Sequence, residues 1–140
     1  MAWTNEQLEA INSEGSNIIV SAGAGSGKTA VLSERVLEKL KSGVNINEIL
    51  ILTFTNAAAF EMATRIKNKI KENNELAYQL ETFDSAYITT FDSFALAMLR
   101  KYHYAKNLSP NISVIEEALV KSLKEKIIDE IFEEKYLNMD

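Results

Sequence analysis

Three short apolar runs alternate with longer amphipathic stretches along the part of the chain that precedes Pro110. The apolar runs cover residues 17–21, 49–54 and 86–90. Continuous apolar runs of this length are typical of strands buried on both faces of a parallel sheet. Helical spacing of apolar residues predicts four helices, over residues 1–15, 28–41, 57–71 and from Asp92 or Ser93 to Arg100. Strands that alternate with helices predict an α/β fold with a parallel sheet and right-handed crossovers.

Several helix ends carry their own sequence signals. Thr4 is the predicted N-cap of the first helix, with Gln7 as its capping-box partner, and Gly15 is the predicted C-cap. The pair Thr55–Asn56 is predicted to cap the helix that follows the second strand. A weaker helical stretch is expected to run from the Asn73–Asn74 break to Leu80.

A different organisation begins near the single proline of the chain. Residues 107–113 read as a linker, and Ile115, Leu119 and Leu123 begin an apolar series that recurs every fourth residue. This spacing predicts an acidic amphipathic helix over 114–136, with no strand after it. We therefore expect residues 1–106 to form the first part of an α/β lobe and residues 114–140 to begin a helical subdomain.

Composition narrows the chemistry more than it identifies a partner. The 140 residues suffice for one small domain or for part of a larger one. The absence of cysteine excludes disulfides, thiolate metal sites and a cysteine nucleophile, and the single histidine makes a histidine-based site implausible. No apolar run reaches the length of about 18 residues that a membrane span needs, so we expect a cytoplasmic protein with no membrane partner. The net charge of −5 does not indicate a particular partner.

The strongest chemical signal follows the first predicted strand. There the sequence reads Ala22-Gly23-Ala24-Gly25-Ser26-Gly27-Lys28-Thr29-Ala30, with alanine at the first position of a pattern that strictly asks for glycine. Glycines let a backbone approach a phosphate closely, and the N-terminus of the next helix attracts anions. Lys28 is predicted to reach the terminal phosphates, and Thr29 to coordinate Mg²⁺. The stretch therefore predicts a nucleotide-binding phosphate loop.

Four stretches in this order resemble the UvrD/Rep-type superfamily 1 DNA helicases. They are residues 3–11, 22–29, 53–62 and 89–94, and the tail from Leu96 to Tyr136 is similar to the AddA/RecB helicase–nuclease branch. The resemblance implies a RecA-like lobe, ATP and Mg²⁺ as cofactors, and single-stranded DNA as the track of a motor in DNA repair or recombination. It also implies the remainder of a longer helicase chain and a partner subunit, with an exonuclease activity elsewhere.

The resemblance also assigns roles to individual residues. Gln7 would read adenine, because an amide both donates and accepts hydrogen bonds, and this role is compatible with its capping role. Phe54 would stack on a DNA base, with the last core position of its strand as the alternative. The other implied DNA contacts are Thr55, Asn56, Thr90 and Ser93. Asp92 stands where many relatives have histidine; we assign it as an N-cap, because a carboxylate repels phosphate.

Some expected parts of a helicase site are missing from this sequence. No apolar strand ends in the Asp-Glu pair that would activate the attacking water, and the basic run Arg65–Lys71 is either a solvated helix face or a further DNA contact. We therefore expect negligible hydrolysis by the 140 residues alone. Two alternatives are a phosphate-loop kinase or NTPase unrelated to DNA, and a non-catalytic module that docks a partner through helix 114–136.

Overall fold

The computed structural model describes residues 3–15 and 17–137 and divides the chain into two compact units, residues 1–95 and 96–140. The elements of the first unit are α1 (Asn5–Asn12), α2 (Lys28–Lys41), β1 (Leu50–Thr53), α3 (Asn56–Lys71), β2 (Tyr87–Thr90) and the start of α4 (Phe91–Lys101). Short 3₁₀ turns, η1 (Ile46–Glu48), η2 (Asn74–Glu81) and η3 (Phe83–Ser85), join them. The predicted helical stretch to Leu80 is thus a 3₁₀ segment. The second unit contains η4 (His103–Lys106) and α5 (Glu117–Leu137).

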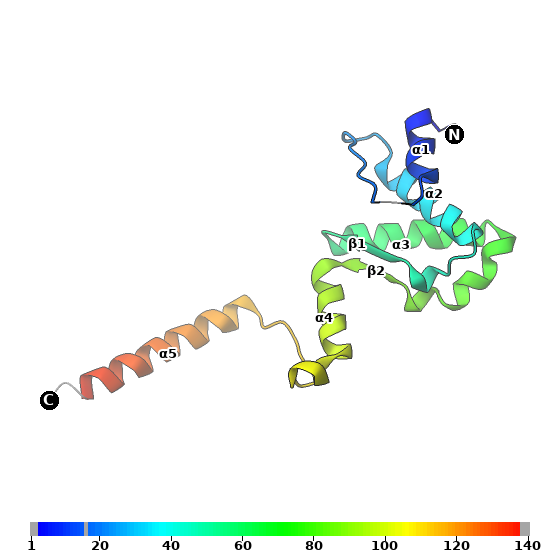
Figure 1. Cartoon of the computed structure of the whole chain (residues 1–140). Helices are drawn as coiled ribbons and strands as arrows, with labels where there is room; N and C mark the ends of the chain where they lie inside the picture. Colours follow the sequence, from blue (N-terminus) through cyan, green and yellow to red (C-terminus); the bar gives the residue numbers. More distant parts are fainter. Residues whose placement is uncertain (1–2, 16, 138–140) are drawn as a thin grey trace. The chain divides into compact units, whose positions relative to one another are not determined.

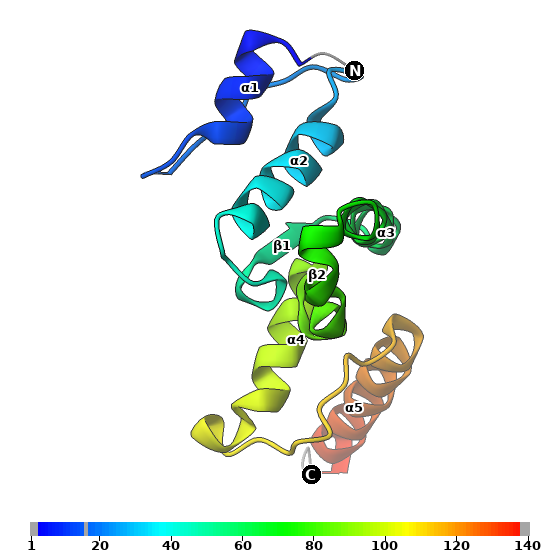
Figure 2. The ribbon, with the colours of Figure 1, turned by 90° about the vertical axis from the view of Figure 1, so that its right-hand side faces the viewer.

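The strands β1 and β2 form a parallel pair, as the alternation of strands and helices predicted. Leu50 is level with Tyr87, and the pairing continues to Thr53 and Thr90. The helix α3 connects the two strands and packs against both of them, as the two views in Figures 1 and 2 show. The carboxyl ends of β1 and β2 therefore lie side by side and open into α3 and α4.

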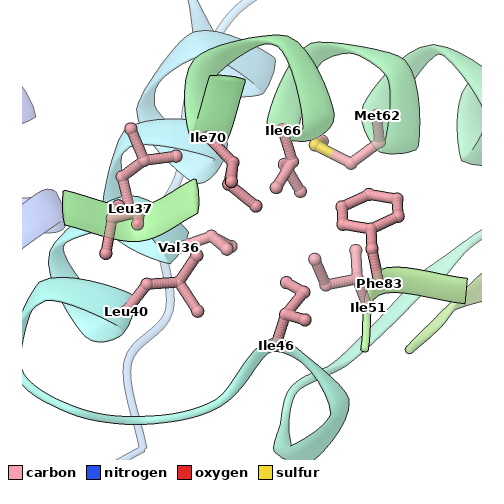
Figure 3. Packing of buried hydrophobic residues seen from close by; sticks show 10 residues of the cluster. Val36, Leu37, Leu40, Ile46, Ile51, Met62, Ile66, Ile70 and Phe83 are labelled. Carbon is pink, nitrogen blue, oxygen red and sulfur yellow. The ribbon is translucent and has the colours of Figure 1, made fainter. Parts of the chain in front are cut away.

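One hydrophobic cluster holds the first unit together (Figure 3). Its buried side chains come from α2, α3, the strands and the 3₁₀ turns, and they are Val36, Leu37, Leu40, Ile46, Ile51, Met62, Ile66, Ile70, Leu76 and Phe83. The buried Gln79 joins two of the turns, since its Oε1 accepts from Ile46 N at 2.8 Å and its Nε2 donates to Val44 O at 3.3 Å. The fixed frame behind the glycine loop is therefore α2 packed against α3.

The first helix forms as predicted at its start but not at its end. Thr4 accepts a hydrogen bond from Gln7 N at 3.3 Å, and Thr4 N donates to Gln7 Oε1 at 2.9 Å, so the capping box is present. The prediction that Gly15 is the C-cap is wrong, because the helix ends at Asn12 and Ser13 is the C-cap. Gly15 instead takes a positive φ of 87° in the loop beyond.

The prediction of a first strand over residues 17–21 is wrong for this structure. These residues have no regular secondary structure, and Ile19 is 96% exposed. A strand needs a neighbour for its backbone hydrogen bonds. Within the described residues, β1 and β2 pair with each other and neither pairs with this segment. The apolar run thus has the composition of a buried strand without the partner that would bury it.

The starts of the two helices that follow the strands differ in how well they were predicted. Thr55 caps α3, because its hydroxyl accepts from Ala58 N at 3.1 Å, although the helix begins at Asn56, one residue early. The prediction of Asp92 as an N-cap is wrong: α4 begins at Phe91, and the Thr90 hydroxyl accepts from Ser93 N at 3.2 Å. Asp92 lies in the first turn, where a carboxylate interacts favourably with the helix dipole.

The second unit has little internal packing. Arg100 Nε donates to Ile112 O at 2.9 Å, which holds the segment after η4 against the last turn of α4. The helix α5 begins at Glu117, three residues later than predicted, and none of its residues from Glu117 to Leu137 is buried. Within the described part of the chain, no helix combines the length and the apolar character that a bilayer crossing requires.

Candidate functional site

The glycine-rich loop turns sharply just before α2. Ser26 N and Ser26 Oγ both donate to Gly23 O, at 3.4 and 2.8 Å. Gly25 and Gly27 have positive φ values of 76° and 83°, which other residues adopt only with strain. The predicted loop residues thus form a compact turn that ends at the first residue of α2.

Lys28 folds back over this turn. Its Nζ donates to Ala22 O at 2.9 Å and to Gly23 O at 2.6 Å. The side chain is exposed, so the ammonium group is accessible from solvent while the two loop carbonyls hold it. The structure therefore places one positive charge directly at the glycine loop.

The N-terminus of α2 adds an anion-attracting group beside this charge. The N-cap is Gly27, which has no side chain to accept from the first-turn N–H groups. Such uncapped N–H groups and the helix dipole together favour a bound anion. Thr29 is exposed in the same first turn, and Ala30 follows it half-buried. The first turn of α2 can therefore bind phosphate, and Thr29 presents a hydroxyl next to it.

Gln7 is the link between α1 and the loop. Its Nε2 donates to Ser26 O at 3.2 Å, while its Oε1 accepts from Thr4 N. An amide has a second N–H and a second lone pair, so both ends can still bind a ligand. The capping role and the ligand-reading role predicted for Gln7 are therefore compatible in this geometry.

A cavity of about 520 Å³ lies between α1, the loop and α2. This volume is within the usual range for sites that bind small molecules. Its lining residues are Thr4, Glu6, Gln7, Ala10, Val20, Ser21, Ala22, Ser26, Lys28, Val31, Leu32 and Arg35. The cavity therefore joins the predicted base-reading residue to the predicted phosphate-binding lysine.

Arg35 is a residue of this cavity that the sequence reasoning missed. Its guanidinium donates to the carbonyls of Ala10, Ile11 and Ser13 at 2.8, 3.0 and 2.8 Å. These carbonyls belong to the end of α1, far from α2 in sequence, so no local pattern could indicate the contact. The one available signal is that Arg35 lies two helical turns after Lys28 and so on the same face of its helix.

Hydrogen bonds also set the charges of two carboxylates on and after α1. Glu6 accepts from its own backbone N–H and from the Thr4 hydroxyl, which lowers the pKa of Glu6 from its ordinary value. The Lys39 ammonium, 2.7 Å from Glu14, lowers the pKa of Glu14. Both carboxylates are therefore charged at neutral pH. The described residues hold no group of three or more histidine, aspartate or glutamate side chains that could bind a metal ion.

A second candidate surface lies at the carboxyl ends of the strands. Phe54 follows β1 and is 94% exposed, so the alternative that it is a core residue of the strand is wrong. Phe91 follows β2 and is 56% exposed, and the two ring centroids are 6.0 Å apart with their planes tilted by 38°. The sequence reasoning missed Phe91, although the parallel register makes it the neighbour of Phe54. Two exposed rings can stack on the bases of a single strand.

The other predicted DNA contacts differ in exposure. Thr55 and Asn56 are exposed at the N-terminus of α3, next to Phe54. Ser93 is exposed, but Thr90 is buried, and its hydroxyl donates to Ser93 Oγ at 2.9 Å. The structure thus brings these residues to one edge of the sheet but leaves Thr90 little access to a ligand.

The basic residues of α3 are largely paired with carboxylates. Arg65 lies 3.0 Å from Glu61, and Lys67 lies 3.7 Å from Asp84. Lys69 forms an ion pair with Glu34 of α2. These pairs favour the interpretation of the basic run as a solvated helix face, with its charges balanced within the unit.

Replacing Gly27 by alanine is expected to lower the free energy of unfolding by about 1–2 kcal/mol, because the left-handed φ is strained for alanine. The added Cβ would also lie 3.4 Å from Gln7 Nε2, so the affinity for MgATP should fall as well. Chemical denaturation and equilibrium binding measure the two effects. Gly43→Ala is the matched control, since its φ of 96° has the same strain but open space around it. Loss of MgATP affinity in both variants would show that the effect is not specific to the loop.

The fold and this geometry define an α/β protein with an anion-binding glycine loop at the start of a helix. Comparison with known families then identifies the class more narrowly. The UvrD/REP helicase N-terminal domain matches residues 3–140, so the chain belongs to this family.

Individual relatives agree with this assignment. The chain is similar to the ATP-dependent helicase/nuclease subunit of Lactobacillus gasseri, with 47% identity over 99% of the chain and 12% of that protein. The protein of the same name from Lactobacillus johnsonii is 48% identical over 92% of the chain and 11% of that protein. That of Heliobacterium modesticaldum is 42% identical over 96% and 10%. The chain thus spans about a tenth of the length of these relatives.

Proposed function

We propose that this chain is the N-terminal ATP- and single-stranded-DNA-binding segment of an ATP-dependent DNA helicase, within a helicase–nuclease subunit. The observation that carries the proposal is the shared loop: Lys28 and Gln7 both bind it, from opposite sides of one cavity. A base-reading amide and a phosphate-binding ammonium at one loop suit a nucleotide, which has both groups. The family assignment supports this activity for the longer protein.

The described residues fit ATP and Mg²⁺. Uncapped N–H groups at the start of α2 would bind phosphate oxygens, and Lys28 would pair with the terminal phosphates. The Thr29 hydroxyl would supply one ligand to Mg²⁺, with phosphates and water as the others, because Mg²⁺ is commonly held in this way. When bound, the ion neutralises charge on the transferred phosphoryl group.

The strand ends would bind the DNA. Phe54 and Phe91 would stack on bases, and the exposed Thr55, Asn56 and Ser93 would contact phosphates near the N-termini of α3 and α4. ATP hydrolysis would then drive translocation along single-stranded DNA in the longer protein. This activity would serve DNA repair or recombination in the cytoplasm, together with a partner subunit.

Residues 1–106 would form the first part of a RecA-like phosphate-loop lobe, and residues 114–140 the start of a helical insertion, with 107–113 as the linker. The exposed apolar run at 17–21 supports this proposal, because it has the composition of a sheet strand that still lacks a neighbour. The carboxylates that activate water would come from the remainder of the longer protein. Glu130 of α5 does not suit that role, since it lies 3.8 Å from Lys126 on an exposed helix face.

The two alternatives are less well supported. A kinase would need lid arginines and an acceptor-binding base, for which the sequence offers no candidates. A docking module that uses α5 would be independent of nucleotide, whereas the family match extends through α5 to residue 140.

Equilibrium binding to the 140-residue chain tests the proposal. We expect it to bind MgATP and a fluorescein-labelled oligothymidine, with no measurable ATP turnover even when DNA is present. Failure to bind MgATP would overturn the proposal. Turnover stimulated by DNA would instead show that a catalytic carboxylate lies within these residues.

A further inference from the structure

Arg35 ties α1 to α2 more firmly than any other polar contact between these helices. Its Nη1 donates to Ala10 O and Ile11 O, and its Nη2 donates to Ser13 O. The side chain is half-buried and lines the cavity. Three hydrogen bonds from one planar group fix both the distance and the angle between the two helices.

The chemistry of α1 explains why an arginine suits this position. The last carbonyls of a helix have no partner within the helix, and they carry the negative end of its dipole. A guanidinium offers several donors in a fixed fork, so it can satisfy more than one of these carbonyls at once. A lysine ammonium has the same charge but cannot reproduce this planar arrangement.

The position of α1 in turn sets the position of Gln7. The helix has eight residues, and Gln7 lies one turn before Ala10, so a rigid shift of α1 moves the Gln7 amide. At its other end, Gln7 Nε2 makes a single bond of 3.2 Å to Ser26 O. The anchor at the carboxyl end of α1 therefore decides where the amide faces the cavity.

We propose that Arg35 is a positioning residue for nucleotide selectivity: by holding the carboxyl end of α1 against α2, it places the Gln7 amide to discriminate adenine from guanine. This inference rests on the proposed ATP site. Lys28 and Thr29 sit on α2 itself, so they do not depend on the anchor. Arg35 should therefore affect recognition of the base and leave recognition of the phosphates unchanged.

The test is Arg35→Lys in the full chain, with MgATP, MgGTP and magnesium tripolyphosphate as probes. We expect about a fivefold to tenfold loss of MgATP affinity, the range for one neutral hydrogen bond, and less than a twofold change for MgGTP and tripolyphosphate. The ratio of ATP to GTP affinity should fall accordingly. A merely structural role would lower the affinity for all three probes together, and that result would overturn the inference.

Two further variants sharpen the test. Glu14→Gln removes the exposed Lys39–Glu14 ion pair between the same parts of the chain, and we expect it to leave the ATP to GTP ratio unchanged. The double variant Gln7→Ala, Arg35→Lys should lose no more MgATP affinity than Gln7→Ala alone, because Arg35 acts through Gln7. Additive losses would contradict that route. If the wild-type chain binds none of the three probes, the proposed function fails rather than this inference.

Discussion

Replacing Lys28 by alanine is expected to lower the affinity for MgATP about 100-fold. Hydrogen bonds to charged groups contribute about 1.5–3 kcal/mol each, and Lys28 carries the charge nearest to the glycine loop. The side chain is exposed and bonds only to loop carbonyls, so the fold should be retained. Titration calorimetry with MgATP measures the loss, and thermal unfolding checks that the structure is intact.

Lys41→Ala is the matched control for this variant. Lys41 lies on the same helix, but in its last turn, where it pairs with Glu38 at 2.7 Å. Both substitutions remove one positive charge, so a general effect of net charge would lower the affinity of both. We expect Lys41→Ala to bind MgATP within twofold of the wild type. An unchanged affinity in Lys28→Ala would show that Lys28 does not contact the phosphates.

Replacing Phe54 by alanine is expected to lower the affinity for single-stranded DNA about tenfold. Stacking of a base on an aromatic ring contributes about 1–3 kcal/mol, and the ring of Phe54 is almost fully exposed beside Phe91. Because the ring buries little surface in the protein, its removal should leave the free energy of unfolding nearly unchanged. Fluorescence anisotropy with labelled oligothymidine measures the DNA affinity.

Tyr78→Ala is the matched control for the DNA experiment. Tyr78 is an aromatic residue that is 52% exposed, but it belongs to η2, which follows the opposite end of α3 from Phe54. Its loss should not change DNA affinity. A similar loss in both variants would indicate nonspecific adsorption of DNA to exposed rings. No loss in Phe54→Ala would remove the strand ends from the proposed DNA path.

Features that depend on neighbouring residues were predicted well from the sequence. The capping box of Thr4 and Gln7, the start of α2 at Lys28 and the cap at Thr55 all formed as expected. Each of them depends on residues within about one helical turn. The prediction for Asp92 failed because two candidate caps lay close together, and the end of β2 placed Thr90 rather than Asp92 at the helix start.

The candidate site shows the same division. The glycine loop and Lys28 were predictable from the sequence motif, whereas their roles in binding ATP and DNA stay predictions. The bonds that assemble the cavity were not predictable, since Gln7 reaches Ser26, and Arg35 reaches the end of α1, across long stretches of chain. The pairing of Phe54 with Phe91 likewise required the register of two strands that α3 separates.

By itself, the sequence determined the α/β class, the helix starts and the phosphate-binding motif, because hydrophobic spacing, caps and glycine conformations act over short distances. Tertiary structure decided which apolar run became a strand and which polar side chains met around the cavity. A strand exists only where another strand satisfies its backbone, and residues 17–21 have the composition without that neighbour. A hydrogen bond between distant residues exists only where packing of whole helices brings its two ends together, as the packing of α1 on α2 does for Arg35.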